Sequence, residues 1–150
     1  MADTKQRTLV SVEEEQRISR AVIAWLNGWD GLPSAVTRID FEQLPADRVG
    51  MALSVIQGAY IVRRYVTGGY MGEYNFQVIY RIKPAQSNDA RLKADEVLNA
   101  LADWAQSHLP DLGTGIRTVK CEATARGALV AKYENGDEDH QILMKLNYEV

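Results

Sequence analysis

The chain has 150 residues, a hydrophobic content of 46%, a charged content of 25% and a formal net charge of −3. This length suits one domain whose core needs no disulfide or metal. The acidic balance argues against a nucleic-acid binder, whose surface is usually basic. The single cysteine excludes an internal disulfide framework and fits a reducing compartment. No apolar run approaches the ~20 residues of a membrane span.

The N-terminal part predicts an arm followed by a helix. Residues 1–10 are expected to form a flexible arm, because the first seven are mostly polar and chain ends commonly fray. They contain no apolar stretch typical of a secretory signal. Residues 11–150 are then expected to form one domain. Its first helix runs from Ser11 to about Asn27, since Ser11 and Glu14 have the spacing of a capping box.

Strands are predicted next, over residues 36–41, 51–56 and 59–66. The turn at Thr67-Gly68-Gly69 leads into a further strand over residues 70–82. From residue 74 onward apolar and polar residues alternate, with one exception, as in a strand that has one buried face. The last two of these strands together predict a long hairpin with a projecting, glycine-rich tip.

The second half repeats the order of helix and strands. Pro84 ends the hairpin, and a helix follows from Ser87 to His108. Strands are predicted over residues 116–125 and 128–133, and Asn-Gly in the following turn indicates a hairpin. The last strand begins at His140. The expected fold is α+β, a mainly antiparallel sheet with two helices packed on it.

The sequence predicts no catalytic residue, no cofactor site and no metal site. His108 is expected at a helix C-terminus, where the helix dipole favours a partly cationic imidazole. His140 is expected at the rim of the sheet. Cys121 is expected as a buried or half-buried small side chain rather than a nucleophile. There is no nucleophile-elbow serine and no phosphate-binding loop motif.

Acidic residues gather between positions 134 and 139, around a predicted turn. Their spacing does not match a calcium loop, which needs oxygen ligands at alternate positions and a glutamate at the twelfth. We expect a solvated turn, and a charged contact surface is the alternative interpretation.

Aromatic, basic and methionine residues gather near the hairpin tip, and these residue types are enriched at protein contacts. Large apolar side chains at a projecting tip would be exposed on a monomer, which is unusual without a partner. The predicted interface combines this tip with two residues of the acidic turn: Arg63, Arg64, Tyr65, Tyr70, Met71, Tyr74, Glu134 and Asp137.

Two other interpretations stay open. Arginines beside tyrosines also suit a platform on which nucleic-acid bases stack, so a nucleic-acid-binding adaptor is one alternative. The other is a small-ligand binding domain or an enzyme on a generic α+β fold, with a pocket beneath Trp25, Trp29 and Trp104. Salt-dependent DNA binding would favour the adaptor.

Three strings stand out along the chain: GYMGEYNF at 69–76, RIKP at 81–84 running into DEVLNALADW at 95–104, and YENGDEDHQ at 133–141. Together they resemble the tail-terminator, or minor-capsid, family of long-tailed bacteriophages. The similarity is a pattern spread over roughly the region after residue 18, and it brings no catalytic motif.

The resemblance implies a hexameric ring on the finished tail tube, which ends tube polymerisation and joins the tail to the head connector. The implied partners are further copies of the chain, the tail tube protein and the connector protein, with DNA at most passing through the ring lumen. The implied location is the tail or neck of the virion, and the host cytoplasm during assembly. The resemblance also implies that the protein is not an enzyme.

Overall fold

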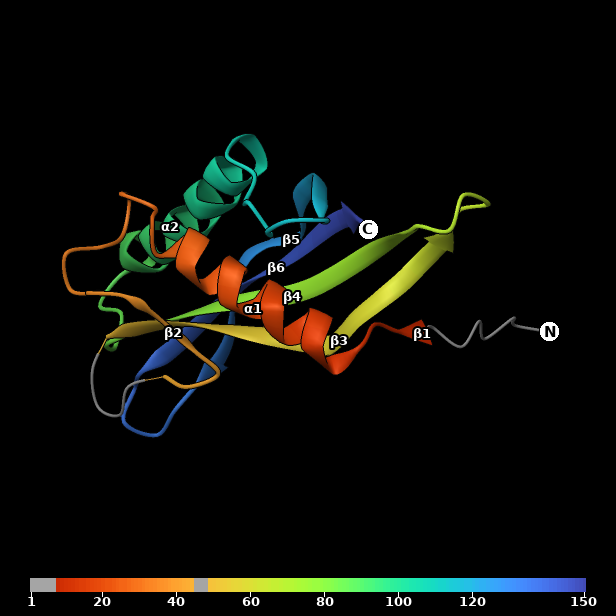
Figure 1. The fold of residues 1–150 in the computed structure, drawn as a ribbon. Helices are drawn as coiled ribbons and strands as arrows, with labels where there is room; N and C mark the ends of the chain where they lie inside the picture. The colour runs from red at the N-terminus through yellow and green to blue at the C-terminus, as the bar shows by residue number, and fades with distance from the viewer. Residues whose placement is uncertain (1–7, 45–48) are drawn as a thin grey trace.

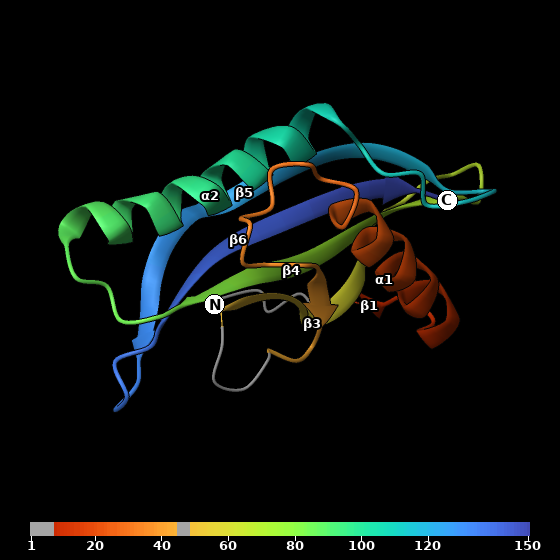
Figure 2. The same ribbon diagram turned by 90° about the vertical axis from the view of Figure 1, so that its left-hand side faces the viewer.

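The computed structural model describes residues 8–44 and 49–150. Two helices, α1 (Val12–Leu26) and α2 (Asn88–Ser107), pack on the same face of a single sheet (Figure 1, Figure 2). The strands of this sheet are β1 (Thr8–Leu9), β2 (Ile39–Phe41), β3 (Gly50–Arg64), β4 (Tyr70–Ile82), β5 (Arg117–Lys132) and β6 (Glu138–Glu149).

The sheet is mainly antiparallel, and its strands follow the order β1-β3-β4-β6-β5. Only β2 is parallel to its neighbour, β3. The predicted α+β class is therefore confirmed, as is the order of helix, strands, helix and strands. Neither helix in the described part of the chain is long and apolar enough to cross a membrane.

Both helices begin with the predicted serine cap. The Ser11 side chain accepts a hydrogen bond from the Glu14 N–H at 3.2 Å, and the Ser87 side chain accepts one from the Ala90 N–H at 3.2 Å. Such caps satisfy backbone donors that have no partner within the helix. The apolar stripe of α1 then reaches the core through Ile18, which is fully buried.

The β3–β4 hairpin is longer than the sequence predicts. One strand replaces the two predicted over 51–56 and 59–66, because Gln57-Gly58 forms a β-bulge instead of a turn. Both bulge residues have a positive φ, 58° at Gln57 and 83° at Gly58. The Glu15 carboxylate of α1 accepts a hydrogen bond from the Ala59 N–H at 2.7 Å, which supports the bulge.

The break predicted between residues 125 and 128 is also a local irregularity within one strand, β5. The Gly127 N–H donates to the Asn99 side chain of α2 at 2.9 Å, so the helix bridges the irregular stretch. The last strand begins at Glu138, two residues earlier than predicted.

The core lies between the helices and one face of the sheet. The helix-facing side chains of β4 and β6 are buried, and the opposite face of these strands carries half-buried side chains for most of its length. The large core side chains of the two strands are Tyr74, Phe76, Val78, Tyr80, Ile142, Met144, Leu146 and Tyr148.

The start of the domain differs from the expected boundary. Thr8 and Leu9 pair with β3, and the Val10 N–H donates to the Ala59 carbonyl oxygen at 3.0 Å. The sheet therefore includes residues that were expected to belong to a flexible arm over 1–10. Residues 1–7 of that arm lie outside the described residues.

Candidate interaction surface

The hairpin tip extends past the end of β6, as both ribbon views show (Figure 1, Figure 2). Glu149 at the end of β6 lies opposite Met71, and the turn beyond it has no neighbouring strand. The turn is closed by its own backbone: the Tyr65 N–H donates to the Gly69 carbonyl at 2.8 Å. Gly68 has a φ of 103°, which a glycine adopts without strain. The tip is therefore a defined turn.

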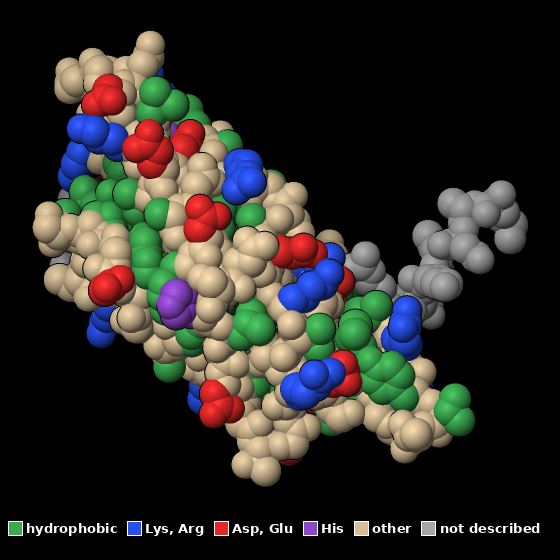
Figure 3. Space-filling model, turned by 90° about the horizontal axis from the view of Figure 1, so that it is seen from above, with side chains coloured by type: hydrophobic (Ala, Val, Ile, Leu, Met, Phe, Trp, Pro, Cys, Tyr) green, Lys and Arg blue, Asp and Glu red, His purple; other side chains and the backbone are tan. Residues whose placement is uncertain are grey.

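The tip exposes apolar and basic side chains together. Val62 is 54% exposed and Val66 is completely exposed, at 107% of its reference area. Arg63 and Arg64 are exposed, and neither forms a salt bridge with a carboxylate of residues 8–44 or 49–150. Figure 3 shows hydrophobic side chains at this projecting end, on the right, near basic ones. The tip therefore has the composition of a contact surface.

Tyr70 and Met71 form the base of the tip and are half-buried. The Tyr70 hydroxyl donates to the Glu14 carboxylate of α1, and its backbone exchanges two hydrogen bonds with Val150. The Tyr148 hydroxyl donates to the same carboxylate at 2.8 Å. Burial, together with the Glu14 charge, raises the pKa of both hydroxyls. Tyr70 therefore ties the hairpin to its own domain.

Tyr74 does not lie on an accessible surface, contrary to the prediction. Its side chain is fully buried, and its hydroxyl shares a 2.8 Å hydrogen bond with Ser19 of α1. Burial raises its pKa to about 12. Tyr74 is buried, Tyr70 is tied to α1 and Tyr65 is half-buried, so among the described residues the arginines have no series of fully exposed aromatic rings beside them. Base stacking needs such rings, so the geometry disfavours the nucleic-acid platform.

The predicted solvated turn is wrong for three of its four acids. Asp137, Glu138 and Asp139 are buried, with 5%, 0% and 5% of their surface exposed, and only Glu134 is exposed. Burial of carboxylates requires partners. Arg81 binds Asp139 through two nitrogens at 2.8 and 3.0 Å. Asp137 is thus enclosed within its own domain, and Glu134 alone stays accessible for an interface.

His140 is also buried, so its prediction as a rim residue is wrong. Its Nδ1 lies 2.7 Å from Asp95 of α2, and its Nε2 lies 3.4 Å from Glu138. Arg91 of α2 binds Glu138 at 3.0 Å and lowers the pKa of that carboxyl. These residues form a polar connection between α2 and β6 inside the domain. They lie in the core contact between helix and sheet.

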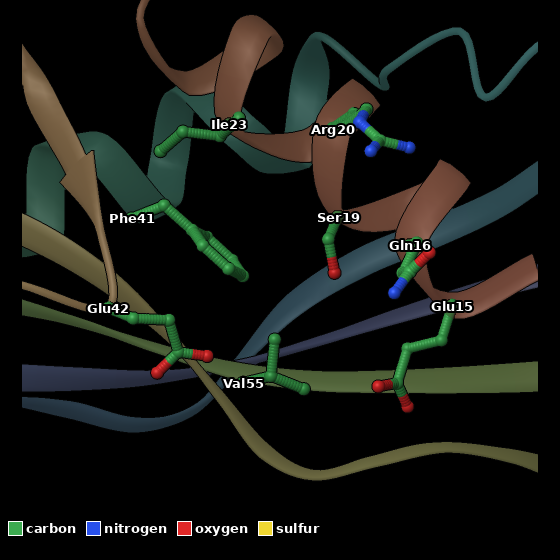
Figure 4. A pocket seen from close by; sticks show the side chains of 8 residues that line it. All are labelled: Glu15, Gln16, Ser19, Arg20, Ile23, Phe41, Glu42 and Val55. Atoms are coloured by element: carbon green, nitrogen blue, oxygen red, sulfur yellow. The ribbon is translucent and has the colours of Figure 1, made fainter. Parts of the chain in front are cut away.

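A groove of about 520 Å³ lies between α1 and the β2–β3 side of the sheet. Figure 4 shows Phe41 and Val55 pointing toward its centre, Ile23 above Phe41, and Glu15 and Glu42 at its two ends. No sequence signal predicts this groove, since it forms only when β2 and α1 meet. Its lining residues are Glu15, Gln16, Ser19, Arg20, Ile23, Phe41, Glu42 and Val55.

The three tryptophans do not surround a binding pocket. Trp25 stacks on Trp104 with 5.4 Å between ring centroids, and the Trp104 ring stacks in turn on His108. Trp29 is 7% exposed and belongs to the core. The aromatic rings thus fill the space between the ends of the two helices, where the sequence suggested a ligand pocket.

The described residues offer little nucleophilic chemistry. Cys121 is 1% exposed, and burial raises the pKa of its thiol to about 12. A thiol with such a pKa stays protonated at neutral pH and is a weak nucleophile. Over residues 8–44 and 49–150, no group of three His, Cys, Asp or Glu side chains is placed to hold a metal ion.

The fold of this chain is similar to the folds of two solved protein chains. The fold is similar to a chain in the virion of a native gene transfer agent (GTA) particle, with a TM-score of 0.52 and 16% identity. The alignment covers 91% of this chain and 92% of that chain. A second solved structure aligns over 94% of this chain and 96% of that one, at 17% identity and a TM-score of 0.46. No family model and no curated protein matches the chain.

Proposed function

We propose that the protein is a structural component of a phage-like virion, which caps the tail tube as a ring. In this role it ends tube polymerisation and joins the tail to the head connector. The ring is a hexamer, and the protein acts through contacts rather than catalysis. Its partners are its own copies, the tail tube protein and the connector protein.

The observation that carries this proposal is the fold similarity to a chain of the GTA virion, which extends over nearly the whole of both chains. The three strings that resemble the tail-terminator family lie along consecutive elements of this fold. One lies at the start of β4, one joins β4 to α2, and one includes the β5–β6 turn. The resemblance therefore concerns connected parts of one domain, to which Thr8 and Leu9 also belong as β1.

The tip surface supports a role in assembly. Val66 at the tip is completely exposed, and two arginines precede it on β3. A single soluble chain gains nothing from such a projecting apolar side chain, whereas a neighbour that covers it gains hydrophobic contact. Repeated contacts between two different surfaces of one chain build a ring when the rotation closes.

The test is microscopy of the purified protein, alone and mixed with tail tubes of the particle that it belongs to. We expect rings of uniform diameter at tube ends, and tubes that no longer lengthen when tube protein is added. Tubes that continue to grow in the presence of excess protein would contradict the proposal. A salt-dependent shift of DNA in the absence of tubes would instead favour the nucleic-acid adaptor.

A further inference from the structure

We infer that the groove beneath α1 receives the β3–β4 hairpin tip of a second copy of this chain. The inference rests on the proposed function, because it assigns the contact by which copies would join into a ring. The contact joins two different surfaces of the chain. One is the exposed β3 side of the tip, residues 62–66, and the other is the groove.

The groove is apolar along its middle and acidic at both ends. Phe41 is 43% exposed, although it lies at the end of β2 against the domain. Glu42 follows it with a φ of 63°, in the left-handed region, and its carboxylate accepts a hydrogen bond from Ser54 at 3.1 Å. Glu15 lies at the other end (Figure 4). An incoming chain with an apolar centre and basic flanks would match this lining.

The tip has that composition. Val66 is its completely exposed apolar side chain at the turn, and behind it Arg63 and Arg64, which are consecutive on β3, point to opposite faces of the strand. An apolar side chain that enters the groove would cover Phe41. The two arginines could then reach Glu15 and Glu42 at the ends of the groove. Arg20 also lines the groove, but Figure 4 shows its guanidinium directed away from the centre. Complementary charges of this kind fix the orientation of a contact.

The tip cannot enter the groove of its own chain. Val55 of the groove and Val62 of the tip belong to the same strand, β3. Val62 lies seven positions along the strand from Val55, and an extended chain of that length spans at most about 23 Å, at about 3.3 Å per residue. Because the strand is paired with β4 along this length, it cannot fold back. The occupant must come from another molecule, and such a head-to-tail contact closes into a ring or continues as a filament.

Paired cysteines test the contact directly. A disulfide forms only when two Cα atoms lie within about 7 Å, so Phe41→Cys with Val66→Cys reports tip-in-groove docking under mild oxidation. We expect a ladder of covalent oligomers up to the size of the ring. Gln16→Cys with Val66→Cys is a second pair that keeps Phe41 in place. The native Cys121 is 1% exposed and does not interfere.

Two controls separate the outcomes. Val66→Cys alone should stay monomeric, and so should Leu92→Cys with Val66→Cys, because Leu92 is an exposed apolar residue of α2 that does not line the groove. Covalent dimers of Val66→Cys alone would indicate a tip-to-tip contact and overturn the inference. Rings in the microscope without cross-links from either pair would overturn it too, while the proposed function would stand. A protein that forms no ring and never caps tubes would overturn both.

Charge reversal gives a second measurement. Arg63→Glu with Arg64→Glu should lower the cross-linking yield about tenfold, since like charges would then meet across the contact. Adding Glu42→Arg to this variant should restore most of the yield. If the cross-linking yield of the Arg63→Glu, Arg64→Glu variant is unchanged, the arginines do not pair with the acidic ends of the groove. That result would also overturn the docking of the tip in this groove.

Discussion

At the scale of single residues, the most informative feature is the polar cluster around His140 between β6 and α2. Glu138 and His140 are fully buried, and both face α2, where Arg91 and Asp95 meet them. The alternation of β6 indicated a strand from His140, yet the sequence could not show that α2 would cover its polar start. The positions in the strand were predictable, and their partners were not.

Replacing Glu138 tests this cluster through pH. Arg91 lowers the pKa of Glu138 in the folded chain, so its contribution is complete above the usual glutamate pKa of about 4.3. That contribution is lost as the pH falls through the lower, folded value. Glu138→Gln should cost about 2 kcal/mol at pH 7. In chemical denaturation, the free energy of unfolding of Glu138→Gln should also change less than that of the parent protein between about pH 5 and pH 3. An equal pH dependence of the two free energies would mean that the Glu138 carboxylate does not stabilise the fold.

Gly72 tests the packing of β4 against β6. A Cβ at this position would lie 2.2 Å from the ring of Tyr148, which is fully buried. Gly72→Ala should therefore lower stability by about 1–3 kcal/mol, as overpacked cores do. Combining Gly72→Ala with Tyr148→Leu removes the overlap between the new methyl group and the ring. In thermal unfolding, the double variant should therefore lose less stability than the two single variants lose together. Strict additivity would mean that the two residues do not compete for space.

Cys121 gives a simple measure of core integrity. Its thiol is buried and its pKa is raised to about 12, so a thiol reagent at pH 8 should react with it only when the chain opens. We expect labelling in denaturant and almost none in the native protein over the same time. Rapid native labelling would place the thiol at the surface and contradict its burial in the core.

At the scale of elements, the sequence predicted the helices and the hairpin closely, because capping serines and strict alternation are local signals. It predicted breaks at Gln57-Gly58 and near Gly127, where the structure has irregularities within single strands. A bulge and a turn share the same residue preferences, so only the neighbouring strand distinguishes them. The groove could not be predicted, since it depends on how β2 meets α1.

The hairpin tip should divide into a structural base and a free end. Tyr70→Phe removes the hydroxyl that donates to Glu14 and should lower stability by about 1 kcal/mol or more. Val66→Ser changes a completely exposed side chain and should leave the melting temperature unchanged while it weakens assembly. Calorimetry of the two variants distinguishes them. A large loss of stability in Val66→Ser would mean that the tip packs on its own domain.

At the scale of the whole molecule, the chain combines a projecting tip, a groove with acidic ends and a fold similar to a GTA virion chain. The apolar tip and the apolar centre of the groove are separate surfaces on one chain, which suits a closed ring of identical subunits. In the described part of the chain, the buried Cys121 and the buried acids of the β5–β6 turn serve packing and pairing. In the proposed function, the protein acts through contacts between its copies and with the tube.

The most direct test is to add the purified protein to growing tail tubes and measure tube ends and lengths by electron microscopy. We expect a ring of six subunits on one end of each tube, and we expect the capped tubes to stop growing. We also expect a variant with Arg63→Glu, Arg64→Glu and Val66→Ser to leave tubes uncapped while folding normally. Tubes that stay bare and lengthen in the presence of the parent protein would contradict the central claim.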